Sequence, residues 1–348
     1  MPALFRPIES AFRAQYSELK ERASAAGELL PGTPGTLALR GAAHRKYWYR
    51  VYYWPPGKQH EILVGRADDE AAHQAMEERM THAEWIAAQV ANLRKLGFQV
   101  ADKDSARVLV ELHNRKAFQA GLVLVGTLAT MAWLNELGAM TPLARTQDVD
   151  LARFERLKLA APLSFLGTLQ ATGLPFTAVP GLHPGDRPTS VKLPGAQGLR
   201  VDVLAPGRKL GSPVRIAELD WTAQAIPHYD YLLGETEPAA VLAGSHCIPV
   251  RLPQPARMVW HKLYASTQRA GLIDKARKDR RQALVLGAAL TELDPTALRR
   301  ALDAAPPAML RPIRPLAQAL VAEATEHGEF ADRLRRCLAG PPGAKRKS

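Results

Sequence analysis

Two acidic residues separated by a single residue form the clearest chemical signal in this sequence of 348 residues. Asp148 and Asp150 lie in the segment 145–151, which we expect to form a β-strand. In a strand, residues i and i+2 point to the same face, about 6–7 Å apart, so both carboxylates converge on one place. Like charges this close repel each other unless a cation lies between them, and carboxylate oxygens suit Mg²⁺. We therefore expect a magnesium site that binds a triphosphate.

A third acidic residue, Asp202, interrupts the apolar pattern of another predicted strand at 198–204. Because burying an unpaired carboxylate costs several kcal/mol, a compensating positive charge is expected near it. One interpretation is an ion pair with Arg200 or Arg208. The other makes Asp202 the third ligand of a two-metal site. In such a site, ions about 3.5–4 Å apart stabilise the attacking and leaving oxygens of an in-line displacement.

A glycine and a threonine follow the short apolar run 122–125. The run is typical of a strand buried on both faces, and a helix is predicted to follow it at 128–137. Gly126 would let a phosphate approach the backbone closely, and Thr127 would add a hydroxyl beside the free N–H groups of the helix start. The turn suits a triphosphate; the competing interpretation is an ordinary capped helix.

Other elements must position these residues. A helix at 8–26 precedes a turn-rich linker and an aromatic β-hairpin with strands at 47–54 and 59–64. Charge-rich helices follow at 68–96 and 105–118, and the sequence beyond residue 251 is helical through to residue 338. We expect five parts: an N-terminal helix and hairpin (1–67), a helical connector (68–120), a core with the acidic residues (121–252), a C-terminal helical domain (253–340) and a basic tail (341–348).

The overall charge favours polyanionic partners. The sequence has 46 Lys and Arg against 34 Asp and Glu, a net charge of +12. Uniform basicity of the source genome is the competing explanation. Two cysteines without metal-ligand spacing, no apolar run of about 18 residues and no secretory start predict a cytoplasmic protein without a membrane partner.

The aromatic hairpin has two interpretations. Of the fourteen Trp and Tyr residues, six lie in 47–54, among basic side chains. Such rings could stack on nucleic-acid bases, with the basic residues along the phosphates. Strand alternation places Tyr47, Tyr49, Val51 and Tyr53 on one face, and we expect at least one face of the strand to pack against a helix. A second basic stretch, at 269–281, lies close to the predicted triphosphate site and could receive the nucleotide or a tRNA end.

The combined order of these motifs resembles a known superfamily. Gly126 and Thr127, then Asp148 and Asp150, then Asp202 on a later strand are similar to the Gly-Ser/Thr, Asp-x-Asp and third acid of nucleotidyltransferases of the DNA polymerase beta type. The form around Asp148 looks closest to the AbiEii-like toxin nucleotidyltransferases of toxin–antitoxin and phage-defence systems. Those toxins also carry a Lys-x-x-Ala helix, a following Arg and a basic-Asp pair, which match 262–265, 269 and 278–279.

The resemblance implies an α+β fold, with a nucleotidyltransferase-type mixed sheet flanked by helices, and a role for each matching residue. Asp148, Asp150 and Asp202 would bind two Mg²⁺ ions, with Asp202 also helping to deprotonate the acceptor hydroxyl. Gly126 and Thr127 would hold the phosphates of the NTP. Lys262 would neutralise the triphosphate, and Asp279 would orient Lys262 through an ion pair or bind near the nucleotide; a solvated helix lysine is the competing interpretation of Lys262.

Two positions depart from the pattern of those toxins. Gln282 stands where they often have a second Asp, and His261 stands where they have an acid before the Lys. We expect a Mg²⁺-dependent nucleotidyltransferase that uses an NTP, with RNA or tRNA favoured as acceptor, a protein or small molecule next, and an antitoxin as a further partner. The alternative is a non-enzymatic binding protein that retains the fold.

Overall fold

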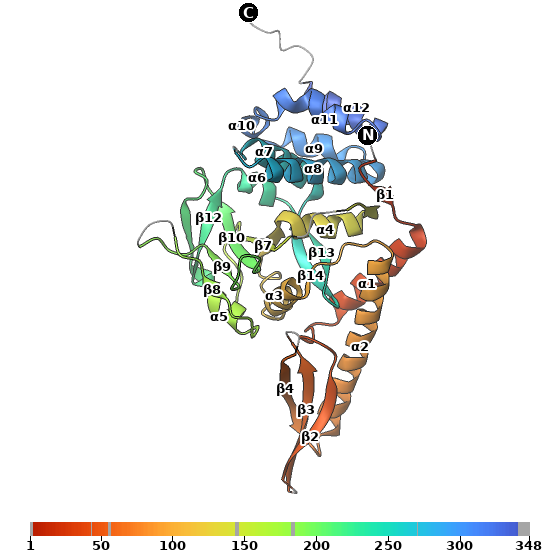
Figure 1. Ribbon diagram of the computed structural model, residues 1–348, viewed down its shortest axis with the longest axis vertical. Coiled ribbons are helices and arrows are strands. Elements are labelled where there is room, and N and C mark those ends of the chain that lie inside the picture. Colours follow the sequence, from red (N-terminus) through yellow and green to blue (C-terminus); the bar gives the residue numbers. More distant parts are fainter. Residues whose placement is uncertain are drawn as a thin grey trace, which may run out of the picture.

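The computed structural model describes residues 3–42, 44–54, 57–142, 146–181, 185–269 and 271–339. The molecule is elongated, with an arm at one end, a mixed sheet in the middle and a helical layer at the other end (Figure 1). The predicted basic tail 341–348, residue Arg145 and the Pro55–Pro56 turn lie outside the described residues.

The central sheet has seven strands in a mixed arrangement. β7, β10 and β12 are parallel, and β5 and β11 pair antiparallel at the two ends of the order β11-β12-β10-β7-β5, while β9 pairs with β10 and β8 with β9. The bounds are β5 (Val123–Val125), β7 (Asp148–Ala152), β8 (Thr177–Ala178), β9 (Ser190–Lys192), β10 (Arg200–Pro206), β11 (Pro213–Ile216) and β12 (Trp221–Ile226). The expected α+β fold with a mixed sheet flanked by helices is confirmed.

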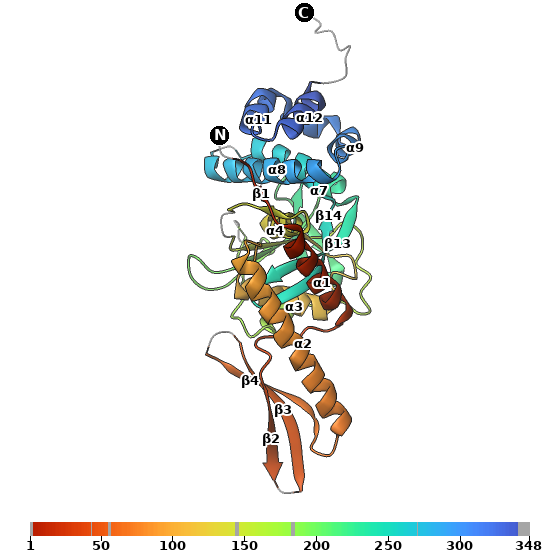
Figure 2. The ribbon, with the colours of Figure 1, turned by 90° about the vertical axis from the view of Figure 1, so that its right-hand side faces the viewer.

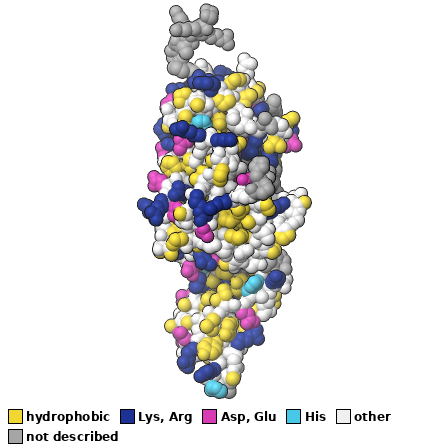
Figure 3. All heavy atoms as spheres, turned by 90° about the vertical axis from the view of Figure 1, so that its left-hand side faces the viewer, with side chains coloured by type: hydrophobic (Ala, Val, Ile, Leu, Met, Phe, Trp, Pro, Cys, Tyr) yellow, Lys and Arg dark blue, Asp and Glu magenta, His cyan; other side chains and the backbone are white. Residues whose placement is uncertain are grey.

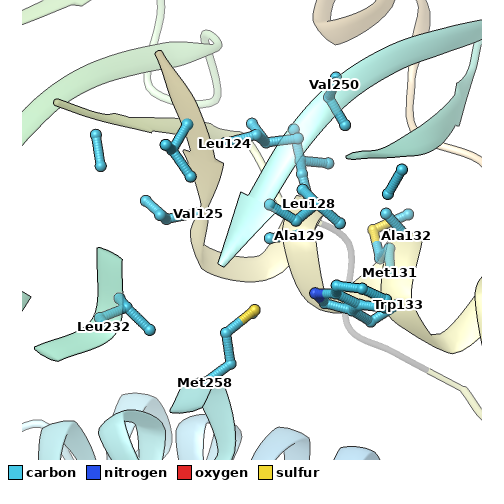
Figure 4. Packing of buried hydrophobic residues seen from close by; sticks show 14 of the residues in the cluster. Leu124, Val125, Leu128, Ala129, Met131, Ala132, Trp133, Leu232, Val250 and Met258 are labelled. Atoms are coloured by element: carbon cyan, nitrogen blue, oxygen red, sulfur yellow. The ribbon is translucent and has the colours of Figure 1, made fainter. Parts of the chain in front are cut away.

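Apolar side chains on α4 join the sheet to the elements around it. Leu128 and Ala129 of this helix lie near Leu124 of β5, Ala132 lies beside Met131 and Trp133, and Met258 lies on the opposite side of the cluster (Figure 4). The helix begins at Gly126, two residues earlier than predicted. The surrounding elements are α3 (Lys103–Asn114), α4 (Gly126–Glu136), α5 (Phe165–Gln170), the 3₁₀ turn η1 (Ala217–Leu219), α6 (Tyr229–Leu233), the hairpin β13 (Thr236–Ala243) and β14 (His246–Pro253), and the small pair β1 (Arg6–Pro7) and β6 (Ala139–Met140).

The C-terminal part is helical, as predicted. Pro255 occupies the first turn of α7, where a missing N–H costs nothing, and the side chain of Gln254 accepts a hydrogen bond from the Arg257 amide. Trp260 is fully buried and donates its indole N–H to the Leu298 carbonyl at 2.9 Å. The elements are α7 (Pro255–Thr267), α8 (Ile273–Leu293), α9 (Ala297–Asp303), α10 (Pro307–Leu310), η2 (Arg314–Leu316), α11 (Ala317–Glu323) and α12 (Gly328–Leu338).

The N-terminal part differs from the prediction. In place of a two-stranded hairpin, three strands form an antiparallel sheet, which lies beside α2 and projects from the body (Figure 2). The additional strand falls in the predicted linker, because the Pro- and Gly-rich turn ends at residue 35 and a strand follows it directly. The bounds are α1 (Ser10–Ala25), β2 (Thr36–Ala42), β3 (Arg45–Tyr53), β4 (Gln59–Arg66) and α2 (Glu70–Lys95). We call the sheet β2–β4 with the facing half of α2 the arm.

One face of β3 packs against its neighbours, as expected. The Trp48 ring lies 4.5 Å from the imidazole of His73 on α2. Arg50 is fully buried and donates to the carbonyl oxygens of Pro31 and Pro34, each at 2.8 Å. No described helix is both long and apolar enough to cross a membrane.

Candidate functional site

All seven residues singled out in the sequence line one cleft with a volume of about 560 Å³. The cleft lies between the sheet and the first two helices of the C-terminal part. It collects residues from five elements: Gly126 and Thr127 from the start of α4, Asp148 and Asp150 from β7, Asp202 from β10, Lys262 from α7 and Asp279 from α8.

Strand pairing brings the acidic residues to this cleft. β7 and β10 run parallel, with Asp150 directly beside Asp202 and Asp148 beside Arg200. On the other side, Asp150 pairs with Val125, the last residue of β5. Asp150 therefore lies between Asp202 and the start of α4, and Asp148 shares its face of the sheet because the two are separated by one residue.

Asp150 is the most strongly perturbed acid of the cleft. Burial, together with the neighbouring carboxylates of Asp202 and Asp148, raises its pKa to about 7. The ammonium groups of Lys262 and Lys278 oppose this rise in pKa without cancelling it. A cation placed beside Asp150 would therefore remove an electrostatic cost that the protein alone leaves uncompensated.

Gly126 is required by both conformation and space. Its φ is +71°, a left-handed value that favours glycine. A Cβ atom at this position would lie 2.0 Å from Oδ2 of Asp150, which is less than any real contact allows. The start of α4 thus approaches the carboxylate more closely than any other residue type would permit. Val125, which precedes the helix, provides no capping side chain, so the first N–H groups of α4 face the cleft without a side-chain cap.

Asp202 forms the ion pair of the first interpretation and also lines the cleft, as the second interpretation requires. The guanidinium of Arg200 donates to Oδ1 at 2.9 Å and to Oδ2 at 3.1 Å, so the ion pair exists. Ser190 on β9 also donates its hydroxyl to Oδ1. The Asp202 side chain still lines the cleft and is 18% exposed. The hydrogen bonds from Arg200 and Ser190 hold the Asp202 carboxylate in its orientation.

Lys262 is buried, so its interpretation as a solvated helix lysine is wrong. The residue is 8% exposed. Its Nζ lies 3.8 Å from Oδ1 of Asp279, which makes the ion pair that was expected. Burial lowers the pKa of Lys262, while Asp279 and Asp150 favour its charged form.

Gln282 was missed as a site residue. Its side chain is 1% exposed and accepts a 2.7 Å hydrogen bond from Nζ of Lys262. Its amide N–H donates to Oγ1 of Thr127 at 3.4 Å. Gln282 therefore joins the lysine of α7 to the threonine at the start of α4. A glutamine satisfies both neighbours here, because its amide is donor and acceptor at once.

The basic stretch at 269–281 divides between the cleft and other contacts. Arg269, Lys275 and Lys278 line the cleft. Arg269 also forms an ion pair with Asp279, with 3.1 Å between Nε and Oδ2. Arg280 instead pairs with Glu323 at 3.0 Å and lies outside the cleft lining. The helical period of α8 decides which of its cations reach the cleft.

Two further residues line the cleft: Tyr229, which had no signal in the sequence, and His261, which the sequence marked only as a departure from the toxin pattern. Tyr229 is buried at the start of α6, and burial beside Asp150 raises the pKa of its hydroxyl. His261 lies 5.1 Å from the Tyr229 ring and within 3.3 Å of the Pro227 carbonyl. Burial lowers the pKa of His261 to about 4, so its imidazole is neutral at pH 7. The position before Lys262, where the toxins carry an acid, thus holds an uncharged packing residue.

The donor set suits a hard cation that keeps part of its own shell. Within the described ranges, no group of three His, Cys, Asp or Glu side chains is arranged to hold a metal ion. Mg²⁺ is usually bound through one or two carboxylates, with water and substrate phosphate oxygens as the remaining ligands. Asp148 and Asp150 on one strand, with Asp202 beside Asp150, provide such carboxylates next to the start of α4, which has no side-chain cap.

Comparison with known proteins identifies the family. Residues 103–306 match the sequence model of a family described as nucleotidyltransferase. No curated protein and no solved structure matches the sequence significantly. The matched region contains every residue described above for the cleft, from Gly126 to Gln282. With more than half of its length matched, the chain belongs to this nucleotidyltransferase family and is a transferase enzyme.

Proposed function

We propose that the cleft binds a Mg²⁺–NTP complex and transfers the nucleotidyl group to a hydroxyl of RNA, with tRNA as the favoured acceptor. One observation carries the proposal. The like-charged carboxylates of Asp150 and Asp202 lie side by side at the start of a glycine-initiated helix, with the Lys262 ammonium in the same cleft. A triphosphate with its cations complements both signs of charge.

The proposed reaction is an in-line displacement. The acceptor oxygen forms a bond to the α-phosphorus, the bond from that phosphorus to the β-phosphate oxygen breaks, and pyrophosphate leaves. The acceptor proton passes to the carboxylate of Asp202, which Arg200 and Ser190 hold in position. Catalysis then depends on positioning and on neutralised charge.

Each remaining residue has a binding role in this proposal. Asp148, Asp150 and Asp202, together with phosphate oxygens of the NTP, would hold two Mg²⁺ ions, which would supply charge neutralisation during the displacement. The N–H groups and hydroxyl at Gly126 and Thr127 bind phosphate oxygens. Lys262, oriented by Asp279 and Gln282, places its ammonium on the triphosphate.

The acceptor class is proposed from charge. Lys275 and Lys278 line the cleft beside the acids, and the whole chain carries a net charge of +12. These positive charges favour a polyanion such as RNA as the acceptor over a protein, whose surface carries charges of both signs. The similarity to toxin nucleotidyltransferases suggests a toxin–antitoxin or phage-defence role, with a small antitoxin protein as the partner.

The test follows labelled nucleotide onto an acceptor. Purified protein is incubated with each α-³²P-labelled NTP, Mg²⁺ and either bulk tRNA or a protein extract. The double variant Asp148→Ala, Asp150→Ala serves as the inactive form, and Asp230→Asn, an exposed acid outside the cleft lining, is the matched control. We expect label on tRNA with the wild type and the control alone, and none from γ-labelled NTP or in EDTA. Label on protein would reject the RNA acceptor, and transfer by the double variant would reject the site.

A further inference from the structure

The outer face of the arm sheet is not covered by any described element. On β3, the side chains of Trp48, Arg50 and Tyr52 point toward α2 and the loop before β2, where they pack. Strand alternation places Tyr47, Tyr49 and Tyr53 on the opposite face. Tyr53 is 52% exposed. Its ring surface is therefore available to a ligand.

Strand register places cations and apolar groups around these rings. Tyr47 lies between Arg40 on β2 and Arg66 on β4. In the next row of the same face, Tyr49 is flanked by Ala38 and Leu63, and Leu63 is 55% exposed. A row with one ring between two guanidinium groups is thus followed by an apolar row.

The charges of the arm are separated between its two layers. Residues 36–66, which form the sheet, contain six Lys and Arg against the single acid Glu61. The facing helix segment 70–84 contains four Glu against one Arg. In Figure 3 the lower part of the molecule, which is the arm, shows hydrophobic side chains with Lys and Arg, and some Asp and Glu, around them. The basic layer is the one that carries the exposed Tyr53 and the half-buried Tyr47 and Tyr49.

We propose that this outer face of the arm sheet binds unpaired nucleotides of the acceptor RNA. Tyrosine rings provide stacking surfaces for bases of any sequence, and the surrounding cations contact phosphates. A purely electrostatic surface would not need the rings. Glu61 is the single acid on this face, where it pairs with Arg40 at 3.0 Å, so the other cations of the sheet outnumber it. This inference rests on the proposed function only in taking RNA as the acceptor.

The position of the arm determines which step it affects. The arm lies at one end of the molecule, whereas the cleft lies between the central sheet and the helical layer at the other end (Figure 1). The tyrosines therefore contact a part of the RNA remote from the reacting hydroxyl. Their loss should raise the KM for RNA and leave kcat at saturating RNA and the affinity for NTP unchanged.

The experiment measures RNA binding without NTP. Fluorescently labelled bulk tRNA is titrated with the full chain and with Tyr49→Ala/Tyr53→Ala, and the double variant Tyr49→Phe/Tyr53→Phe retains the rings. We expect the alanine variant to bind about tenfold or more weakly and the phenylalanine variant to bind like the wild type. Lys58→Glu reverses an exposed charge beside the sheet. Lys95→Glu reverses an exposed charge at the far end of α2 and is its control.

Four outcomes would overturn the inference. The wild type could fail to bind tRNA, or the alanine variant could bind tRNA as tightly as the wild type. Lys95→Glu and Lys58→Glu could weaken tRNA binding equally, or the alanine variant could lose binding of a protein partner and keep that of tRNA. Equal melting temperatures show that the variants fold. Tyrosine-dependent tRNA binding without any label transfer would reject the proposed reaction and keep this inference. Label transfer to RNA that does not depend on the tyrosines would keep the proposed reaction and reject this inference.

Discussion

The charged residues of the cleft are buried or half-buried and interact with one another, whereas those on the outer face of the arm are exposed to solvent. In the cleft, Asp150, Lys262 and Gln282 are wholly or partly buried, and each depends on a neighbour from another element. On the arm, Tyr53 is exposed and cations such as Lys58 extend into solvent. Buried charges interact strongly because water does not screen them, whereas exposed ones act almost independently. Substitutions in the cleft should therefore have large and coupled effects, and those on the outer face of the arm smaller and additive ones.

The largest effect is expected from Asp150→Asn. The substitution removes the carboxylate between Asp202 and the start of α4, so nucleotidyl transfer should fall about 10³-fold. In EDTA, the free energy of unfolding should stay the same or increase, because a charge disfavoured by its like-charged neighbours is lost. Label transfer and urea denaturation measure the two quantities. A variant that lost stability and kept its activity would contradict the roles assigned to the cleft.

Arg50→Met tests the packed face of the arm. The substitution removes the hydrogen bonds to the carbonyl groups of Pro31, Thr33 and Pro34, and we expect a loss of about 3 kcal/mol in local stability. Limited proteolysis should cut the arm faster while leaving the body intact. NTP binding in the cleft should not change; if it did, the two regions would be coupled and the comparison would fail.

Glu218→Gln provides a reference charge in the body outside the cleft. Glu218 accepts hydrogen bonds from Arg153 at 2.8 Å and from the Leu157 amide at 2.9 Å, which lower its pKa to about 2. Because the folded pKa lies below the unfolded value of about 4.5, the stabilisation is complete above pH 4.5 and is lost as the pH falls toward 2.

The variant should therefore be less stable than the wild type by about 2 kcal/mol at pH 7, with the difference shrinking between pH 4.5 and pH 3. Urea denaturation at a series of pH values measures this. A difference that stayed constant with pH would mean that the ion pair is not its cause. Transfer activity at pH 7 should be unchanged.

The smallest effect in the cleft is expected from Gln282→Met. The variant keeps the volume of a side chain that is 1% exposed but removes the partner of both Lys262 and Thr127. We expect about a tenfold fall in kcat/KM for NTP. Combined with Thr127→Val, the loss should be clearly less than the product of the single losses. The corresponding pair Tyr49→Ala and Lys58→Glu on the arm should give a simple product.

The parts of the fold predicted from sequence are those with strong local patterns. The buried run before Gly126, the strands that carry Asp150 and Asp202, and the helices of the C-terminal part were all predicted from their own residues. By contrast, β2 was taken for part of the linker, because turn signals directly before it masked a weakly alternating strand. No element was predicted between 205 and 252, where β11–β14 and α6 lie.

The site could be predicted only as far as its motifs are local. Asp148 and Asp150 are two residues apart, but Gln282 and Thr127 are separated by 155 residues and meet only through the packing of α8 beside α4. Nothing in the sequence around Gln282 distinguishes it from the exposed polar residues of the same helix. The sequence marks Gln282 only as a departure from the toxin motif, and the structure shows what the glutamine contacts.

The separation of charge across the arm has a consequence for how a large ligand would first approach. A basic sheet in front of an acidic helix is an electric dipole, so a distant polyanion would exert a turning force on the protein as well as an attraction. The turning force fades beyond about 8 Å at physiological ionic strength. At low salt, this torque would turn the protein so that the tyrosines of the arm face the polyanion before the two make contact.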